Sequence, residues 1–235
     1  MTPSRFQKQI RFLQNWLSPQ GYAGLHLTVG VLVVLICGWC FGEIAEDVSL
    51  GDPIVQVDRH VAVWFHQHAS PAVTQVARTI SFFGSVGWLA AVSVAVVLFL
   101  IWRGDHLNAS LVALVMVGGS TLNVIVKHFF HRERPVLENP LVTLSSYGFP
   151  SGHTMGATLF YGLLALFAWK NVRNRTARLA CIVGACIWIL LIGLTRIYLG
   201  AHYLTDVLGA LAAGLLWLVF CWTAFETLRR RRDDF

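Results

Sequence analysis

Six ionisable side chains suited to phosphate chemistry stand in three short segments of this 235-residue sequence. They are Lys127 and Arg134 in the first segment, His153 in the second, and Arg196, His202 and Asp206 in the third. Lysine binds an anion as a point charge and arginine binds it as a bidentate fork, so these cations can hold a dianion. Histidine and aspartate can attack or move protons beside it. If the segments meet in space, they predict an anion site with its own nucleophile.

The first segment holds two cations. Lys127 and Arg134 are seven residues apart, so they share one helix face if the helix continues until Pro135 ends it. Both side chains could then bind one phosphate. The alternative is that one cation anchors the helix end while the other pairs with Glu133 or Glu138.

The second segment, Pro150-Ser151-Gly152-His153, is typical of a helix start. Ser151 can cap the helix, and Gly152 lets an anion approach the free N–H groups of the first turn. Capping alone explains the serine and the glycine. It does not explain His153, a titratable side chain that faces the same point, although a lone histidine at the mouth of a span is usually just an interfacial residue.

The third segment pairs a base with a carboxylate. His202 and Asp206 are four residues apart on one predicted helix face, so Asp206 can orient the imidazole. A helix-stabilising pair is the alternative, but it is worth only about 0.2–0.5 kcal/mol, several times less than the cost of an aspartate near a bilayer. Arg196 adds a third cation across a short turn. The set suits phosphoryl transfer through a phosphohistidine, for which no metal or other cofactor is required.

The elements that must position these residues are apolar helices. Apolar residues make up 56% of the chain and charged residues 13%, against about 45–50% and about 25% in soluble domains, and the mean hydropathy is +0.62. So little charge excludes a soluble globule and a disordered chain. The net charge of +6 does not indicate a nucleic acid partner, because Lys and Arg lie mainly between apolar runs.

We therefore predict an all-α integral membrane bundle of six transmembrane helices forming a single domain, 1–235. The expected spans are 24–41, 84–102, 107–126, 154–169, 179–194 and 204–228. Most of the 18 Lys and Arg residues fall on one side if both termini, including the segment 1–23, are cytoplasmic. The motifs at 127–206 then lie on the outer side.

The outer connection 43–83 is unusually long. Val57, Val61 and Trp64 recur at helical spacing, and so do Val73 and Val76 further along. We expect two amphipathic helices lying at the membrane interface, and packing onto the outer ends of the spans is an equally good alternative.

Three linked motifs resemble the signature of the type 2 phosphatidic acid phosphatase (PAP2) superfamily. They are Lys127-x6-Arg134-Pro135, Pro150-Ser151-Gly152-His153 and Thr195-Arg196-x5-His202-x3-Asp206. One residue departs from the pattern, because the third motif of the family usually begins with serine and here begins with Thr195. The hydroxyl is retained, so we expect little effect on phosphate binding.

The resemblance implies a role for each matching position. His202 would be the nucleophile, Asp206 its orienting partner, and His153 the general acid and then the base that activates water. The phosphate would be bound by Lys127, Arg134, Ser151, Gly152 and Arg196. The membrane branch of this family acts on lipid phosphates on the non-cytoplasmic side, whereas its soluble vanadium haloperoxidase branch does not fit six spans.

The expected activity is hydrolysis of a lipid phosphomonoester or diphosphate in a membrane, with a bacterial inner membrane as the expected location. Candidate substrates are an isoprenoid diphosphate, phosphatidic acid and phosphatidylglycerol phosphate; the sequence does not distinguish them or give the oligomeric state. Transfer to a lipid hydroxyl by the same phosphohistidine is an alternative, and a non-catalytic anion transporter is a weaker one, since no repeated halves are found. His128, His131 and Arg132 lie outside the motifs and are interpreted as solvated loop residues, with a headgroup contact as the alternative.

Overall fold

The regular structure of the described chain is entirely helical. A computed structural model describes residues 24–233 except 52, 139 and 143, so the predicted cytoplasmic segment 1–23 lies outside the described residues. The helices are α2 (Leu25–Leu50), α3 (Pro53–Gln67), α4 (Pro71–Phe82), α5 (Val86–Trp102), α6 (His106–Ala113), η1 (Leu114–Gly118), α7 (Gly119–Phe130), α8 (Gly152–Asn171), α9 (Arg175–Tyr198) and α10 (Leu204–Asp233).

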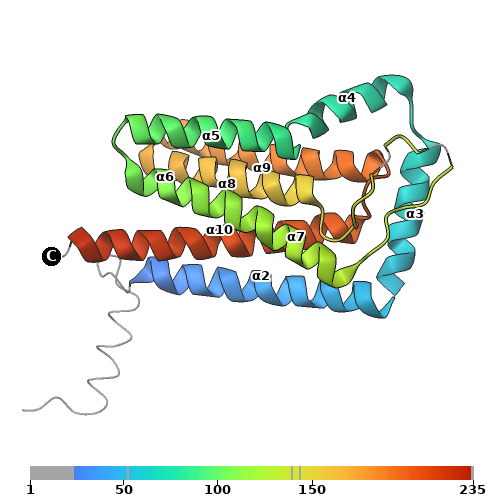
Figure 1. The fold of residues 1–235 in the computed structure, drawn as a ribbon, viewed down its shortest axis with the longest axis horizontal. Coiled ribbons are helices and arrows are strands. Elements are labelled where there is room, and N and C mark those ends of the chain that lie inside the picture. Colours follow the sequence, from blue (N-terminus) through green and yellow to red (C-terminus); the bar gives the residue numbers. More distant parts are fainter. Residues whose placement is uncertain (1–23, 52, 139, 143, 234–235) are drawn as a thin grey trace, which may run out of the picture.

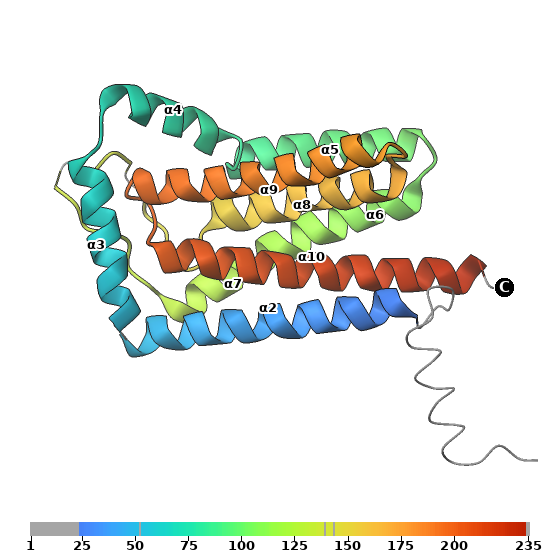
Figure 2. The same cartoon turned by 180° about the vertical axis from the view of Figure 1, so that it is seen from behind.

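The long helices run side by side, and α3 crosses one end of the bundle (Figures 1 and 2). Five helical segments are long and apolar enough to span a bilayer: Leu25–Leu50, Pro71–Trp102, His106–Phe130, Arg175–Tyr198 and Leu204–Arg232. The predicted all-α membrane bundle is confirmed, but the count of six spans is not. The fourth predicted span, 154–169, corresponds to α8, which is not among the five and packs inside the protein, where lipid-facing apolar residues are not needed.

The core forms where α8 packs against the segment α6–η1–α7 and against α10. Leu111, Val115, Leu159 and Leu163 are almost fully buried there. Small residues allow close helix approach: a Cβ on Gly119 would lie 2.2 Å from a methyl carbon of Leu159. Because lipid tails are as apolar as leucine, this close packing, rather than water exclusion, holds neighbouring membrane helices together.

The third span contains one wide turn. Leu114–Gly118 is a π-helical turn that joins α6 to α7, so the helix holds an extra residue there. The indole Nε1 of Trp217, on α10, donates to the carbonyl oxygen of Val115 at 3.2 Å. A carbonyl in the irregular turn is therefore satisfied without water, as the bilayer interior requires.

The predicted pair of helices in the outer connection is confirmed as α3 and α4. The α2 helix, however, continues to Leu50, nine residues beyond the predicted end of the first span, and stops at Gly51 in the left-handed conformation. The buried faces of α3 and α4 carry small or polar residues, and large apolar residues face outward. The buried residues are Asp58, Ala62, Thr74, Ala77 and Ser81, and the exposed ones include Val57, Val63, Trp64, Val73 and Val76. Apolar side chains that face away from the protein fit an interfacial position.

Candidate active site

The first motif does not lie on one helix face as predicted. The α7 helix ends at Phe130, and His131 caps it in the left-handed conformation with φ 48°, so Arg134 lies in the following loop. The loop nevertheless returns Arg134 to the helix end. The Nζ of Lys127 donates to the carbonyl oxygen of Tyr147 at 2.7 Å, and Nη2 of Arg134 donates to the same oxygen at 3.1 Å. The two cations therefore converge through a shared acceptor.

The predicted helix start at the second motif is confirmed. Ser151 caps α8, and its hydroxyl oxygen accepts from the hydroxyl of Thr154 at 3.1 Å. A Cβ on Gly152 would lie 4.0 Å from Cε of Lys127, so the backbone there is close to that cation. The N–H of Ser151 donates to the backbone oxygen of Asp206 at 3.0 Å. The N-terminus of α8 thus lies between the first and third motifs, where it can bind an anion.

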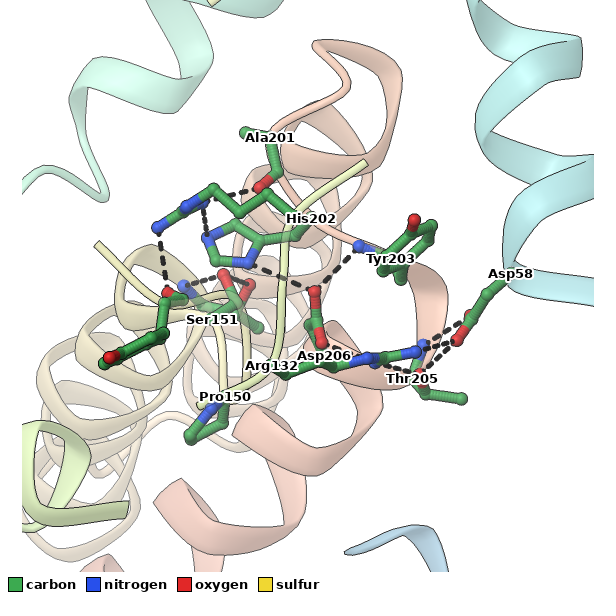
Figure 3. A network of polar contacts seen from close by, with 12 residues as sticks. Asp58, Arg132, Pro150, Ser151, Ala201, His202, Tyr203, Thr205 and Asp206 are labelled. Carbon is green, nitrogen blue, oxygen red and sulfur yellow. Dashed lines mark hydrogen bonds and ion pairs between the residues drawn. The ribbon is translucent and has the colours of Figure 1, made fainter. Parts of the chain in front are cut away.

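The sequence predicts that His202 and Asp206 lie on one helix. In the structure α10 begins at Leu204, so His202 lies in the turn before it. The pair is still formed, with 3.4 Å between Nδ1 of His202 and Oδ2 of Asp206 (Figure 3). On the other side of the ring, Nη1 of Arg134 donates to Nε2 at 3.1 Å. Because a guanidinium can only donate, Nε2 must carry the lone pair and Nδ1 the proton. This tautomer is the one a nucleophilic histidine needs.

Burial also keeps His202 uncharged. It lowers the pKa of His202 to about 4, and the positive charges of Arg134 and Lys127 act in the same direction, while Asp206 opposes them. Burial likewise lowers the pKa of Arg134, and the charge of Asp206 counteracts this. The imidazole is therefore neutral at physiological pH, with its lone pair available for attack.

The other two charged motif residues reach the same end of the bundle. Arg196 is 4% exposed; its Nη1 donates to the hydroxyl of Ser81 on α4 at 2.6 Å, and its Nε is buried without a hydrogen-bond partner among the described residues. His153 packs beside Gly84, where an added Cβ would lie 3.4 Å from the Cβ of His153. Burial lowers the pKa of His153, and the positive charge of Arg196 acts in the same direction. Thr195, the departure from the motif, donates its hydroxyl to the carbonyl of Ile192 at 2.7 Å, within its own helix.

Sequence reasoning missed two residues of this network. Arg132, interpreted as a solvated loop residue, has a side chain only 10% exposed: its Nη1 donates to Oδ1 of Asp206 at 2.5 Å and its Nη2 to Oδ2 of Asp58 at 2.7 Å. The available signal was a carboxylate within an amphipathic helix: Asp58 stands four residues before Ala62, on the same side of α3, and both are buried. His128 and His131 are exposed.

An apolar groove leads from the outside of the bundle toward the site. It lies between α5 and the segment η1–α7 and has a volume of about 320 Å³. Val94 and Val117 line its outer part, whereas Gly152 and Gly156 of α8 form its inner end. A lipid-facing groove that ends at Gly152 is suited to an apolar chain attached to a bound anion.

Comparisons with known proteins agree on one family. The family model of the PAP2 superfamily matches residues 108–230, which include all three motifs. Phosphatidylglycerophosphatase B of Bacillus subtilis is 32% identical over 166 residues, which cover 69% of this chain and 80% of that protein. Undecaprenyl-diphosphatase BcrC of the same organism is 29% identical over 149 residues, or 60% of this chain and 72% of that protein.

A solved structure shares the fold. The crystal structure of a transmembrane PAP2-type phosphatidylglycerolphosphate phosphatase from Bacillus subtilis aligns with a TM-score of 0.74 at 28% identity. The alignment covers 80% of this chain and 94% of that one. The helical bundle is therefore shared with a protein of known structure.

Proposed function

The chain belongs to the PAP2 superfamily, and from this premise we propose that it is an integral membrane enzyme that removes phosphate from a lipid phosphate. Its similar proteins are lipid phosphatases by name, which supports this class of reaction. The observation that carries the proposal is the orientation of His202: Nε2 presents a lone pair beside Arg134, while Nδ1 faces the carboxylate of Asp206.

The reaction begins when Nε2 of His202 attacks phosphorus and the bond to the leaving oxygen breaks. His153 gives that oxygen its proton, and a phosphohistidine remains. His153 then takes a proton from water, whose oxygen attacks the phosphohistidine and releases inorganic phosphate. Asp206 holds the Nδ1 proton throughout and stabilises the positive charge on the ring.

The phosphate oxygens are bound by groups already described around His202. Lys127, Arg134 and Arg196 supply positive charge, and the N-terminus of α8 at Ser151 and Gly152 supplies free N–H donors. The buried Nε of Arg196 is a donor available for this purpose. These groups stabilise negative charge as it builds on the transferring phosphoryl group. None of these steps calls for a metal ion.

The substrate class follows from the groove and from the related proteins. A lipid tail in the groove between Val94 and Val117 would place its phosphate near Gly152. Phosphatidylglycerol phosphate is the first substrate to test, because a similar protein and the solved structure are both named for it; phosphatidic acid and an isoprenoid diphosphate follow. Transfer of the phosphoryl group to a lipid hydroxyl would use the same intermediate.

The location follows from charge. The site lies where α8 and α10 begin, and the opposite end carries the basic residues of the α8–α9 connection and of the end of α10. By the positive-inside rule that basic end is cytoplasmic. The site then faces away from the cytoplasm, toward the periplasm or the cell exterior. The membrane that we propose is the bacterial inner membrane.

The test is phosphate release from these three lipids by purified protein in detergent, with excess EDTA present. His202→Ala should abolish release, whereas His106→Ala, which changes an exposed histidine at the opposite end, should leave it unchanged. Full activity of His202→Ala would refute the phosphohistidine mechanism. Loss of activity in EDTA that added Mg²⁺ restores would refute independence from metal. Label from a ³²P-lipid that appears in a second lipid rather than in free phosphate would indicate transfer.

A further inference from the structure

The third motif is held in place from outside by the interfacial helix α3. Asp58 of α3 is 1% exposed, and both of its carboxylate oxygens are bound to groups near the start of α10. Oδ1 accepts from the backbone N–H of Thr205 at 3.0 Å, and Oδ2 accepts from the hydroxyl of Thr205 and from Arg132. A buried carboxylate with all these partners holds its neighbours in one arrangement.

The backbone of α10 explains why such a partner is needed. The carbonyl of Tyr203 accepts from the N–H of Val207, so Tyr203 is the residue that precedes the first helical turn. Its phenol cannot fold back to cap the free N–H groups, as serine or aspartate would. Asp58 supplies the missing acceptor for Thr205, and Asp206 accepts from the N–H of Tyr203 at 2.9 Å. Two carboxylates from different helices thus cap one helix.

Arg132 joins these two carboxylates. Its guanidinium donates to Oδ1 of Asp206 through one nitrogen and to Asp58 through the other, so Asp206 has only Oδ2 left for His202. The side chains of Asp58 and Asp206 are both fully buried. Figure 3 shows the continuous row from Asp58 through Arg132 and Asp206 to His202.

We propose that Asp58 is a positioning residue for the phosphoryl transfer: acting through Arg132 and Thr205, it fixes the carboxylate of Asp206 that orients His202. The inference rests on the proposed function, because it assigns a role in that reaction. It makes α3 part of the catalytic apparatus rather than only a surface helix. Asp58 touches neither His202 nor the groups that bind phosphate, so its removal should impair turnover and leave substrate binding intact.

The main test is Asp58→Asn, a change of nearly the same shape that removes the charge. We expect kcat to fall about tenfold or more, as for other partners of catalytic groups, with KM within about twofold of its original value. Glu138→Gln removes an exposed carboxylate from the nearby loop and is the matched control, expected to change neither constant.

The pH profile separates positioning from loss of structure. The charged or titratable groups that act on His202 are Asp206, Arg134, Lys127 and His153. Without the charge of Asp58, Arg132 adds uncompensated positive charge beside Asp206, so the acid limb of kcat should move to lower pH. If α3 merely loosened and admitted water, the pKa of His202 would rise toward 6.5 and the limb would move to higher pH.

The outcomes distinguish the two proposals. A kcat of Asp58→Asn within twofold of the original, or an acid limb that stays in place or moves upward, overturns the positioning role alone. Retained activity of His202→Ala overturns the reaction itself, whatever Asp58→Asn does. If Asp58→Asn does not fold, Arg132→Lys replaces it, since lysine keeps the charge but cannot bridge two carboxylates as a planar fork does. A tenfold lower kcat of Arg132→Lys supports the proposal, and an unchanged kcat overturns it.

Discussion

Replacement of Asp206 by asparagine tests the central geometry of the site most directly. The carboxylate is fully buried, and its two oxygens have different partners. Oδ1 accepts from Arg132 at 2.5 Å, whereas Oδ2 accepts from the backbone N–H of Tyr203 at 2.9 Å and faces Nδ1 of His202 at 3.4 Å. Asparagine has one oxygen and one NH2 group, so it cannot serve both sides.

Either orientation of the amide damages the reaction. If the NH2 group faces Arg132, two donors oppose each other and the link to Asp58 loses its charge balance. If it faces His202, Nδ1 must become an acceptor, and the ring proton moves to Nε2, which then cannot attack. A histidine held in the wrong tautomer loses about 10³–10⁴ in kcat, or roughly 4–5.5 kcal/mol of transition-state stabilisation at about 1.36 kcal/mol for each factor of ten.

The assay is steady-state phosphate release by purified Asp206→Asn, with thermal unfolding in the same detergent to verify the fold. KM should stay within about threefold, because Lys127, Arg134 and Arg196 still bind phosphate. A kcat reduced by less than tenfold would show that the carboxylate does not control the tautomer of His202. A large rise in KM at unchanged kcat would place Asp206 in substrate binding instead.

Further predictions concern the pH dependence of activity and stability, and the apolar groove. The pKa of His202 is about 4 in the folded protein, against 6.5 in an unfolded chain. The acid limb of kcat/KM, corrected for ionisation of the substrate, should therefore lie nearer pH 4 than pH 6.5. A limb at pH 6.5 would contradict a buried, neutral ring. As the pH is lowered, the unfolded state takes up this proton before the folded state does. The free energy of unfolding should therefore decrease as the pH falls from 6.5 to about 4, and denaturant titration at several pH values measures this decrease. In the groove, Val117→Trp should lower kcat/KM for long-chain lipid phosphates about tenfold, equivalent to about 1.4 kcal/mol, and leave a short-chain soluble phosphate unaffected. Equal losses for both substrates would argue against a tail in the groove.

The sequence was sufficient for the features that depend on local chemistry. The helix start at Ser151 and the two outer helices follow from capping residues and from the spacing of apolar residues, and both were found. Burial explains the count of spans: α8 is surrounded by protein and needs less apolar sequence than a lipid-facing helix. The end of α2 was misplaced because a helix continues past the apolar run when its later residues remain favourable for helix.

Contacts between distant segments could not be predicted. Arg134 reaches His202 only because the loop after His131 turns back, and no periodicity in the sequence describes that turn. The sequence predicts a solvated Arg132 because its ion-pair partner, Asp58, lies 74 residues earlier and local spacing does not relate the two. A spacing rule relates residues within one helix, and these pairs join a loop to separate helices.

The π-helical turn at Leu114–Gly118 sets the rotational phase of the rest of its helix. One added residue rotates everything beyond it by about 100° and advances it by about 1.5 Å. Asn123 and Lys127 therefore meet Gly152 only because this register shift lies upstream of them, deep among core leucines. The direction in which the phosphate-binding ammonium points is thus decided near the middle of the bilayer, well below the surface where it acts.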